Sequence, residues 1–420
     1  MATSKPTRDT YEVVIDAPEL GPQRRIGWLH RSTRRRDVPA AFEYDAQWLG
    51  RDAFLLDPRL GLWGGEQHPP AGTAAFGIFM DSAPDRWGRV LLEHREAIAA
   101  RREDRPRLQL FEMDFLLGVN DLTRVGGLRF RQGPDAPFLD HGRLAAPPVT
   151  SLRELAAVSR RIEDPDAEEL PEYEAWLAML VAPGTALGGA RPKANFTEDD
   201  GSLWIAKFPS REDRYDVGAW EFLLHRLADK ARIDVPEARL ERLTERYGTF
   251  LVQRFDRTAV GRRMYSSAMT LLEHRDGDNA SYLELAEFIE NNGAQGRVKA
   301  DLAQLFRRVV FNVMAGNRDD HLRNHGFIRV PTGWQIAPAF DMNPNPARGT
   351  HELTLDGATT EPSLDVVLGT ADFYRLTPLE ASAIVDDVRN ALADWRRLAG
   401  DLGLSRSEVQ RMETVLPTNP

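Results

Sequence analysis

The chain has 420 residues, of which 42% are hydrophobic and 28% are charged, and its formal net charge is −10. These values are ordinary for a globular protein with two or three packed units, and the negative charge argues against general nucleic-acid binding. The sequence contains no cysteine, which excludes disulfides, thiolate metal sites and cysteine nucleophiles. We find neither a signal-peptide core nor an apolar run of the ~20 residues that span a membrane, so we expect a cytoplasmic protein without a membrane partner.

Residues 1–148 predict an N-terminal subdomain built from short strands and turns. Strand-like pieces at Glu12–Ile15 and Ile26–Leu29 alternate with turns rich in Pro and Gly, and a helix is expected from Asp85 to Ala100. A stretch rich in Pro and Gly between Gln132 and Pro148 is the best candidate for a linker.

Residues 149–257 predict a mixed lobe of strands and helices. Ser151 and Glu154 have the spacing of a capping box that opens a helix. The elements expected after it are a glycine-rich loop at 184–190, paired strands at 192–196 and 203–208, an amphipathic helix at 218–230, and a hairpin of strands at 239–243 and 249–255.

Residues 258–420 predict a mainly helical lobe. Three further capping boxes begin at Ser281, Thr377 and Ser405. A buried helix at 305–315 is expected to end at Gly316, and strands at 325–330 and 334–339 are expected to pair. The order of elements predicts an α+β, two-lobed, protein-kinase-like fold with an extra N-terminal subdomain.

Three polar residues in this last region have the spacing that phosphoryl transfer requires. Asp319 and Asn324 are separated by four residues, as in the catalytic loop of kinases, and Asp341 follows after the predicted hairpin. One carboxylate can accept the proton of an attacking hydroxyl, while an amide oxygen and a second carboxylate can bind Mg²⁺. The spacing therefore predicts an ATP- and Mg²⁺-dependent kinase; the alternative is a polar loop with turn-forming Asp and Asn.

Lysine is rare in this chain, and two of its five lysines lie where a kinase needs them. Lys207 lies on a predicted strand with Lys193 on the strand before it, and Glu221 on the following helix could pair with Lys207. The alternatives are an ordinary edge-strand lysine for Lys207 and a solvated helix flank for Glu221.

Two further segments could contact the nucleotide. The backbone amides of the loop that contains Gly188 and Gly189 could bind phosphate, although this loop does not match a P-loop. Backbone groups near Gln253 and Phe255 could meet an adenine edge, although a plain strand end accounts for these residues equally well.

Taken together, the motifs resemble the HipA family of bacterial toxin–antitoxin serine/threonine kinases over almost the whole chain. The resemblance rests on an N-terminal subdomain and on the segments 188–194, Lys207, 254–257, 316–324 and Asp341. It implies that Asp319 is the catalytic base, that Asn324 and Asp341 bind Mg²⁺, and that Lys207 contacts ATP. His321, which lies within the catalytic segment, is counted with the nucleotide-binding residues.

The resemblance also implies partners. They are a protein substrate such as an aminoacyl-tRNA synthetase, and a small helix-turn-helix antitoxin of the HipB type through which DNA is bound indirectly. One departure concerns self-inactivation, because family members often carry a phosphorylatable Ser in the glycine-rich loop. The best-matching position here is Ala186 beside Thr185, so either Thr185 is autophosphorylated or this control is lost.

Two other functions remain open at this point. A small-molecule kinase of the aminoglycoside or sugar type would share the same acidic geometry. A degenerate kinase that serves as a binding scaffold is a second alternative, against which the complete catalytic set counts.

Overall fold

The computed structural model describes residues 8–33, 37–50, 53–140, 146–164, 172–184 and 191–417. The chain divides into two compact units, each with its own hydrophobic core: Met1–Arg211 with Asp256–Tyr265, and Glu212–Phe255 with Ser266–Pro420. None of the helices in the described part of the chain combines the length and apolar character that crossing a membrane requires.

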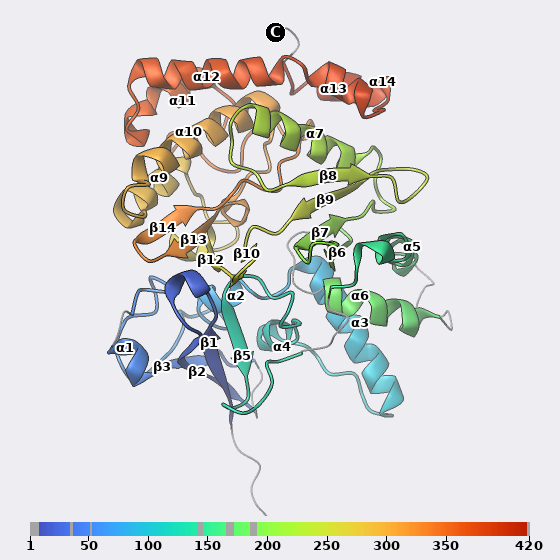
Figure 1. Ribbon diagram of the computed structural model, residues 1–420, viewed down its shortest axis with the longest axis vertical. Coiled ribbons are helices and arrows are strands. Elements are labelled where there is room, and N and C mark those ends of the chain that lie inside the picture. Colours follow the sequence, from blue (N-terminus) through green and yellow to red (C-terminus); the bar gives the residue numbers. More distant parts are fainter. Residues whose placement is uncertain are drawn as a thin grey trace, which may run out of the picture. The chain divides into compact units, whose positions relative to one another are not determined.

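The first unit is built on a five-stranded antiparallel sheet (Figure 1) with strand order β4-β3-β2-β1-β5. Its strands are β1 (Arg8–Ile15), β2 (Arg24–Ser32), β3 (Ala41–Tyr44), β4 (Glu66–Gln67) and β5 (Leu128–Arg131). Alternate residues of the strands, among them Val13, Leu29 and Phe42, are buried in the core because side chains alternate between the two faces. The strands predicted from the sequence are therefore confirmed.

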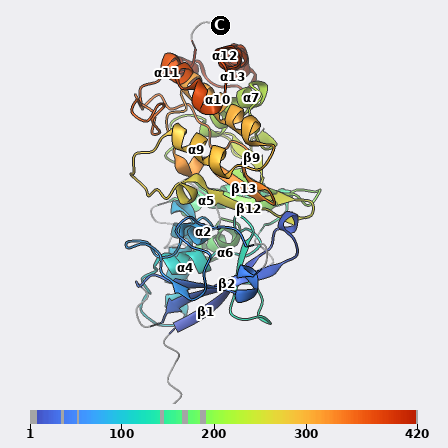
Figure 2. The same cartoon turned by 90° about the vertical axis from the view of Figure 1, so that its left-hand side faces the viewer.

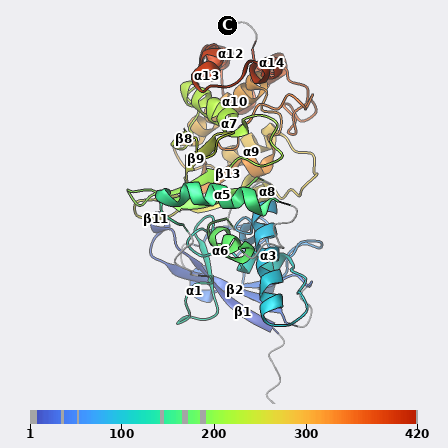
Figure 3. The same cartoon turned by 90° about the vertical axis from the view of Figure 1, so that its right-hand side faces the viewer.

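The other elements of the first unit are short helices, one long helix and two hairpins. The long helix α3 packs against α6, and α6 packs against α5 (Figure 3). The elements are η1 (Pro18–Leu20), α1 (Ala46–Leu49), α2 (Gly77–Met80), α3 (Arg86–Arg102), α4 (Glu112–Leu117), η2 (Val149–Ser151), α5 (Leu152–Ile162), α6 (Tyr173–Gly184), β6 (Lys193–Thr197), β7 (Leu203–Lys207), β10 (Arg257–Thr258) and β11 (Gly261–Arg262).

The second unit is mainly helical. Helices α9 and α10 pack together (Figure 2), and α12 lies along α10 (Figure 1). The elements are α7 (Val217–Lys230), β8 (Ala238–Glu241), β9 (Thr249–Gln253), α8 (Ala268–Leu271), α9 (Tyr282–Asn292), α10 (Val298–Ala315), η4 (Leu322–Asn324), β13 (Gly326–Val330), β14 (Gly333–Ile336), α11 (Leu364–Gly369), η5 (Ala371–Tyr374), α12 (Pro378–Leu392), α13 (Trp395–Asp401) and α14 (Arg406–Met412). Strand β12 (Met264–Ser267) spans the boundary between the units in sequence.

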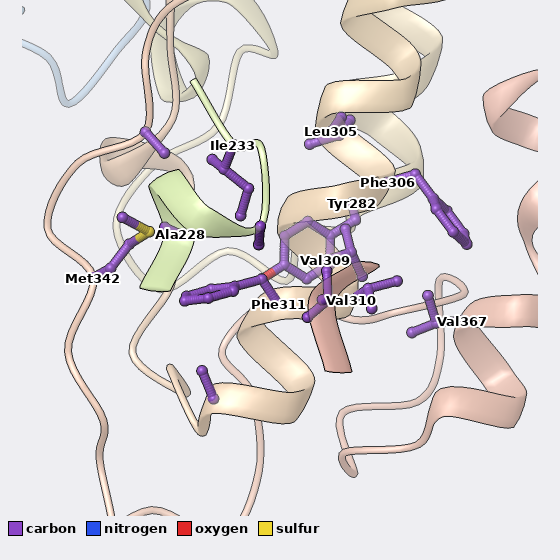
Figure 4. Packing of buried hydrophobic residues seen from close by; sticks show 14 of the residues in the cluster. Ala228, Ile233, Tyr282, Leu305, Phe306, Val309, Val310, Phe311, Met342 and Val367 are labelled. Carbon is purple, nitrogen blue, oxygen red and sulfur yellow. The ribbon is translucent and has the colours of Figure 1, made fainter. Parts of the chain in front are cut away.

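The core of the second unit forms around α10. Phe306, Val309 and Val310 of α10 are fully buried, and Figure 4 shows them near Tyr282 of α9. These apolar positions recur with helical spacing, so one face of α10 is fixed against its neighbours. The rigid helix α10 therefore anchors the loop that follows it.

Three of the four predicted capping boxes are confirmed, whereas the helix predicted at 305–315 begins earlier, at Val298. Ser281, Thr377 and Ser405 each accept a hydrogen bond from the first turn and complete a capping box. The capping box predicted at Ser151 is wrong, because Ser151 closes the 3₁₀ turn η2 and already has a helical backbone with ψ −6°. In this conformation its side chain makes no capping hydrogen bond.

Candidate functional site

The predicted catalytic loop begins where α10 stops. Gly316 ends the helix in the left-handed conformation with φ +67°, and its N–H is bonded to the carbonyl of Asn312. A Cβ at this position would lie 2.5 Å from the Cβ of Val415, so both the conformation and the space favour glycine. The turn directs residues 317–324 away from a buried helix.

Asp319 and Asn324 lie at the two ends of this short loop. The side-chain Nδ2 of Asn324 donates to the backbone carbonyl of Asp319 over 3.3 Å, which ties the two predicted site residues together. The Asp319 side chain is 63% exposed, so a hydroxyl group can approach its carboxylate. Arg348 pairs with this carboxylate, with Nη1 2.5 Å from Oδ1.

The hairpin of β13 and β14 returns the chain to the same loop. The backbone N–H of Asn343 donates to Oδ1 of Asn317 over 3.2 Å, and that of Asn345 donates to the carbonyl of Gly316 over 2.9 Å. Asp341, just before these contacts, has a left-handed backbone with φ +58°, which is uncommon for a residue other than glycine. The structure thus joins the segment of Asp341 to the segment of Asp319 and Asn324.

A buried polar network holds the two loops. The Oδ2 atom of Asp320 accepts hydrogen bonds from Tyr282 Oη (2.7 Å), Asn312 Nδ2 (2.8 Å) and His325 Nε2 (2.8 Å). Asn317 extends the network, because its Nδ2 donates to Oδ1 of Asn312 over 3.0 Å. All five side chains are buried, so the network connects α9, α10, the catalytic loop and, through Asn317, the Asp341 segment.

The surroundings of Asp320 favour its ionised form. Burial by itself would raise the pKa of Asp320, but the adjacent His325 and the hydrogen bonds from His325 and Tyr282 bring its pKa below the ordinary value. Burial and the charge of Asp320 in turn raise the pKa of Tyr282 well above its ordinary value. The motif spacing gave Asp320 no role, although a single Asn312 within the apolar stretch of α10 is a signal that could have revealed the network.

The oxygens of the joined loops suit a divalent cation. Asp341 offers a carboxylate, and Asn324 offers its Oδ1 because its Nδ2 is bonded to Asp319. The Oδ1 atom of Asn343 is buried and has no hydrogen-bond partner in the part of the chain that the structure describes. Carboxylate and amide oxygens are the ligands that Mg²⁺ prefers, so the residues fit this ion. Asn343 was not foreseen from the sequence.

The remaining predicted residues of the second unit lie on β9, on α7 and in the loops that contain Phe255 and His321. The ring of Phe255 packs 5.4 Å from the ring of Phe340, the residue before Asp341. Gln253 ends β9, and its N–H donates to the carbonyl of Glu237 over 2.8 Å, so this N–H is not available to a ligand. Glu221 on α7 is 5% exposed, which excludes the solvated helix flank. His321 is half-buried, and its Nδ1 lacks a hydrogen-bond partner within the described residues.

The first unit places its two predicted lysines opposite each other. Lys193 on β6 pairs in register with Lys207 on β7, so both side chains leave the hairpin on the same face. The Nε1 atom of Trp87 on α3 donates to the carbonyl of Lys193 over 3.0 Å and fixes the start of β6. The predicted residues Gly188, Gly189 and Thr185 lie outside the described residues.

A pocket of about 640 Å³ also lies in the second unit, between α9 and η5. Its lining includes Ser281, Glu284, Glu287 and Phe373 but none of the predicted catalytic or metal-binding residues. We therefore place the candidate site at the two joined loops and not at this pocket.

Comparisons with known proteins place these features in context. The sequence family described as the HipA-like C-terminal domain matches residues 185–396. The putative kinase Y4dM of Sinorhizobium fredii is 30% identical over 163 residues, which cover 34% of this chain and 38% of that protein. The serine/threonine-protein kinase toxin HipA of Shewanella oneidensis is 25% identical over 238 residues, which cover 49% of this chain and 52% of that protein. The chain therefore spans about half or less of the length of these relatives.

A solved structure matches over nearly the whole length. A chain from the Shewanella oneidensis MR-1 complex of HipA, HipB and operator DNA aligns with 96% of this chain and 94% of its own length. The TM-score is 0.63 and the sequence identity is 16%, so this match concerns the fold. The predicted two-lobed, kinase-like fold class is confirmed.

Proposed function

This chain belongs to the family defined by the HipA-like C-terminal domain, and from that premise we propose that it is a kinase that transfers the γ-phosphoryl group of ATP to a serine or threonine of a protein. The observation that carries the proposal is the joining of the Asp319–Asn324 loop to the Asp341 segment through Asn317 and Asn343. A kinase needs a base and two metal ligands at one place.

Asp319 is the proposed catalytic base. It accepts the proton of the attacking hydroxyl while the hydroxyl oxygen bonds to the γ-phosphorus and the bond to the β-phosphate oxygen breaks, which releases ADP. Its exposed carboxylate is accessible to a protein side chain, and Arg348 must yield one carboxylate oxygen to the hydroxyl. Arg348 belongs to an exposed ion pair, which contributes only about 0–1 kcal/mol, so little free energy is lost when Arg348 releases this oxygen.

Asn324 and Asp341 are the proposed Mg²⁺ ligands, with the Oδ1 of Asn343 as a further oxygen close to them in sequence. When bound, Mg²⁺ neutralises charge on the phosphates. The protein holds these oxygens in place through the buried contacts of Asn317 and Asp320. This prior fixation lowers the cost of assembling the site around the nucleotide.

Lys193 and Lys207 are the proposed phosphate contacts. The register places both lysines on one face of the hairpin, and their ammonium groups carry the positive charge that a triphosphate attracts. We assign Gly188 and Gly189 to backbone contacts with phosphate, and Glu221 remains among the predicted nucleotide-binding residues. Phe255, His321 and the carbonyl side of Gln253 are assigned to the rest of the nucleotide.

In the cell we propose that the protein acts as the toxin of a toxin–antitoxin pair in the cytoplasm. The substrate class is a component of translation such as an aminoacyl-tRNA synthetase, and the partner is a HipB-like helix-turn-helix antitoxin. The solved neighbour was crystallised with HipB and operator DNA, which supports this choice of partner. The net charge of −10 supports contact with DNA through the antitoxin and not directly.

Labelled ATP with Mg²⁺ and a cell lysate tests the kinase proposal. We expect the wild-type protein to label a discrete protein band, and Asp319→Asn to reduce the labelling rate by about 10²–10⁴-fold, as the loss of a general base does. Calorimetry should show that Asp319→Asn still binds Mg-ATP, whereas Asp341→Asn binds it more weakly. Asp386→Asn, an exposed carboxylate on α12, is the matched control and should behave as wild type.

Two results would contradict the proposal. Undiminished labelling by Asp319→Asn would remove Asp319 from the role of base. Turnover of aminoglycosides or sugars without any protein labelling would favour a small-molecule kinase instead.

A further inference from the structure

The outer face of the first unit's sheet carries a group of polar side chains outside the candidate kinase site. In β1, Tyr11 and Val13 are core residues, whereas the alternate residue Thr10 is exposed. Thr10 pairs in register with His30 on β2, and Glu43 on β3 pairs with both Trp28 and Glu66. Since Trp28 and His30 are two residues apart, the register places His30, Glu43 and Glu66 on this same outer face.

These three residues bring one ligand atom each to a common point. A ring nitrogen of His30 and one carboxylate oxygen each from Glu43 and Glu66 all lie within 4.8 Å of one another. The distance from His30 Nε2 to Glu43 Oε2 is 3.6 Å. Ligands on a tetrahedral Zn²⁺ lie roughly 3.3–3.5 Å apart, given metal–ligand bonds of about 2.0–2.2 Å, so a contraction of up to about 1.5 Å completes the geometry.

His30 is oriented for this role. Its ring is 9% exposed, and its Nδ1 lies 3.1 Å from the hydroxyl of Thr10. The buried Nε2 atom makes no hydrogen bond within the described residues, since the contact with Glu43 is too long. When Nδ1 donates to Thr10, Nε2 keeps its lone pair and faces the two carboxylates, an arrangement typical of metal-binding histidines.

We propose that His30, Glu43 and Glu66 bind a divalent transition-metal ion, with Zn²⁺ as the best-suited candidate. An imidazole nitrogen favours Zn²⁺ over Mg²⁺, and two carboxylates compensate the charge of the ion. Each ligand comes from a different strand, so the ion ties β2, β3 and the two-residue strand β4 together. The site therefore stabilises the sheet edge.

Arg8 is the group that competes with the metal. It forms an ion pair with Glu66 and, like the proposed ion, supplies positive charge beside the carboxylates. Its side chain is 47% exposed, so Arg8 can turn to solvent when a metal ion binds. Removal of the Arg8 charge should consequently strengthen metal binding, whereas a site that needs Arg8 for its structure would respond in the opposite way.

Calorimetric titration with ZnCl₂ tests the site. The protein is first freed of bound metal with a chelator. The ZnCl₂ titration is then carried out in excess Mg²⁺, so that the candidate kinase site is occupied by Mg²⁺. We expect the wild type to bind one Zn²⁺ per chain. The Zn²⁺ affinity should fall by about tenfold or more in His30→Gln and in Glu43→Gln, and it should rise in Arg8→Gln. His274→Gln is the matched control, because His274 also lies between two carboxylates, Asp278 and Glu284, but in the other unit.

Thermal unfolding gives an independent measurement. Zn²⁺ should raise the Tm of the wild type and of His274→Gln, and leave that of His30→Gln unchanged. Circular dichroism of the metal-free variants establishes that each one is folded. Equal Zn²⁺ affinity in the wild type, His30→Gln and Glu43→Gln overturns the proposal, and so does the absence of binding to the wild type. Either result leaves the kinase proposal untouched, because none of these residues belongs to it.

Discussion

At the scale of single residues, Asp320 shows how a buried charge can position exposed catalytic groups. Its neighbour Asp319 is exposed and is the proposed base, whereas Asp320 points into the protein and receives three hydrogen bonds on one oxygen. The network reaches the Asp341 segment through Asn312 and Asn317. A carboxylate suits this point because it only accepts hydrogen bonds.

Asp320→Asn should therefore disturb both loops. The amide of Asn has the same shape as the carboxylate but no charge, and the three donors would face either its NH₂ group or its neutral oxygen. We therefore expect a loss of about 2–4 kcal/mol in the free energy of unfolding. We also expect lower phosphorylation and weaker Mg-ATP binding in the variant that remains folded. Denaturant unfolding and the ATP-labelling assay measure the two effects.

Tyr282→Phe is a milder change in the same network, which can be compared with Asp320→Asn. It removes one donor to Asp320 but leaves the carboxylate and two other donors, so the loss should be smaller, about 1 kcal/mol. An Asp320→Asn protein with wild-type stability and wild-type Mg-ATP binding would contradict the positioning role.

The same residues show what the sequence can predict. The spacing of Asp319, Asn324 and Asp341 was sufficient to predict that two loops meet, because a hairpin between them restricts the path of the chain. It could not show which of the adjacent residues Asp319 and Asp320 faces solvent, because both occur in a loop without periodicity. That choice depends on partners such as Tyr282, which are distant in sequence.

At the scale of elements, helix ends carry the most reliable local signals. Three of the four predicted capping boxes are present, since a Ser or Thr with an extended backbone can bond to the first turn and a Glu can return the bond. At Ser151 the preceding η2 turn decides the backbone conformation, and no local pattern announces this turn. The glycine at the end of α10 was predicted correctly for a physical reason that can be tested.

Gly316→Ala should destabilise the second unit and displace the catalytic loop. The alanine would have to keep the left-handed backbone conformation of Gly316, and its Cβ would lie 2.5 Å from the Cβ of Val415. We therefore expect a loss of about 2–3 kcal/mol in the free energy of unfolding. Gly400→Ala is the control of opposite sign, because Gly400 lies within α13 and nothing lies within 4 Å of a Cβ built there. It should stabilise the protein by up to about 1 kcal/mol.

Chemical denaturation measures the loss of unfolding free energy expected for Gly316→Ala and the gain expected for Gly400→Ala. A Gly316→Ala protein as stable as the wild type would show that the end of α10 adjusts freely. In that case the loop would depend on its polar network alone.

At the scale of the whole molecule, composition and element order were enough for the fold class but not for the long-range path of the chain. Asp256–Tyr265 belongs to the first unit although the chain on both sides of it belongs to the second. Asp256 accepts a hydrogen bond from the N–H of Gly126, and Arg262 donates to the carbonyl of Asp121. Such contacts join residues more than 100 positions apart, and no local pattern in the sequence contains them.

The stability of the folded chain should also depend on pH through His351. This residue is 3% exposed, and burial lowers its pKa from 6.5 to about 4; the charge of Asp320 acts in the opposite direction, and that of Arg318 lowers the pKa further. Between these two pH values the unfolded chain binds the proton and the folded chain does not, so the free energy of unfolding falls as the pH is lowered from about 6.5 to about 4. The shift corresponds to about 3.4 kcal/mol.

Replacement of His351 isolates this contribution from those of the carboxylates, which also titrate in acid. In His351→Gln, denaturant unfolding at pH 7 and at pH 4.5 should show a smaller loss of stability than the wild type, by about 2 kcal/mol, because no proton is taken up at position 351 on unfolding. The exposed His68 serves as control, and His68→Gln should follow the wild type. All measurements are made with a chelator, so that the proposed metal site does not contribute. If the unfolding free energies of His351→Gln and the wild type changed equally with pH, His351 would be protonated in the folded protein as readily as in the unfolded chain.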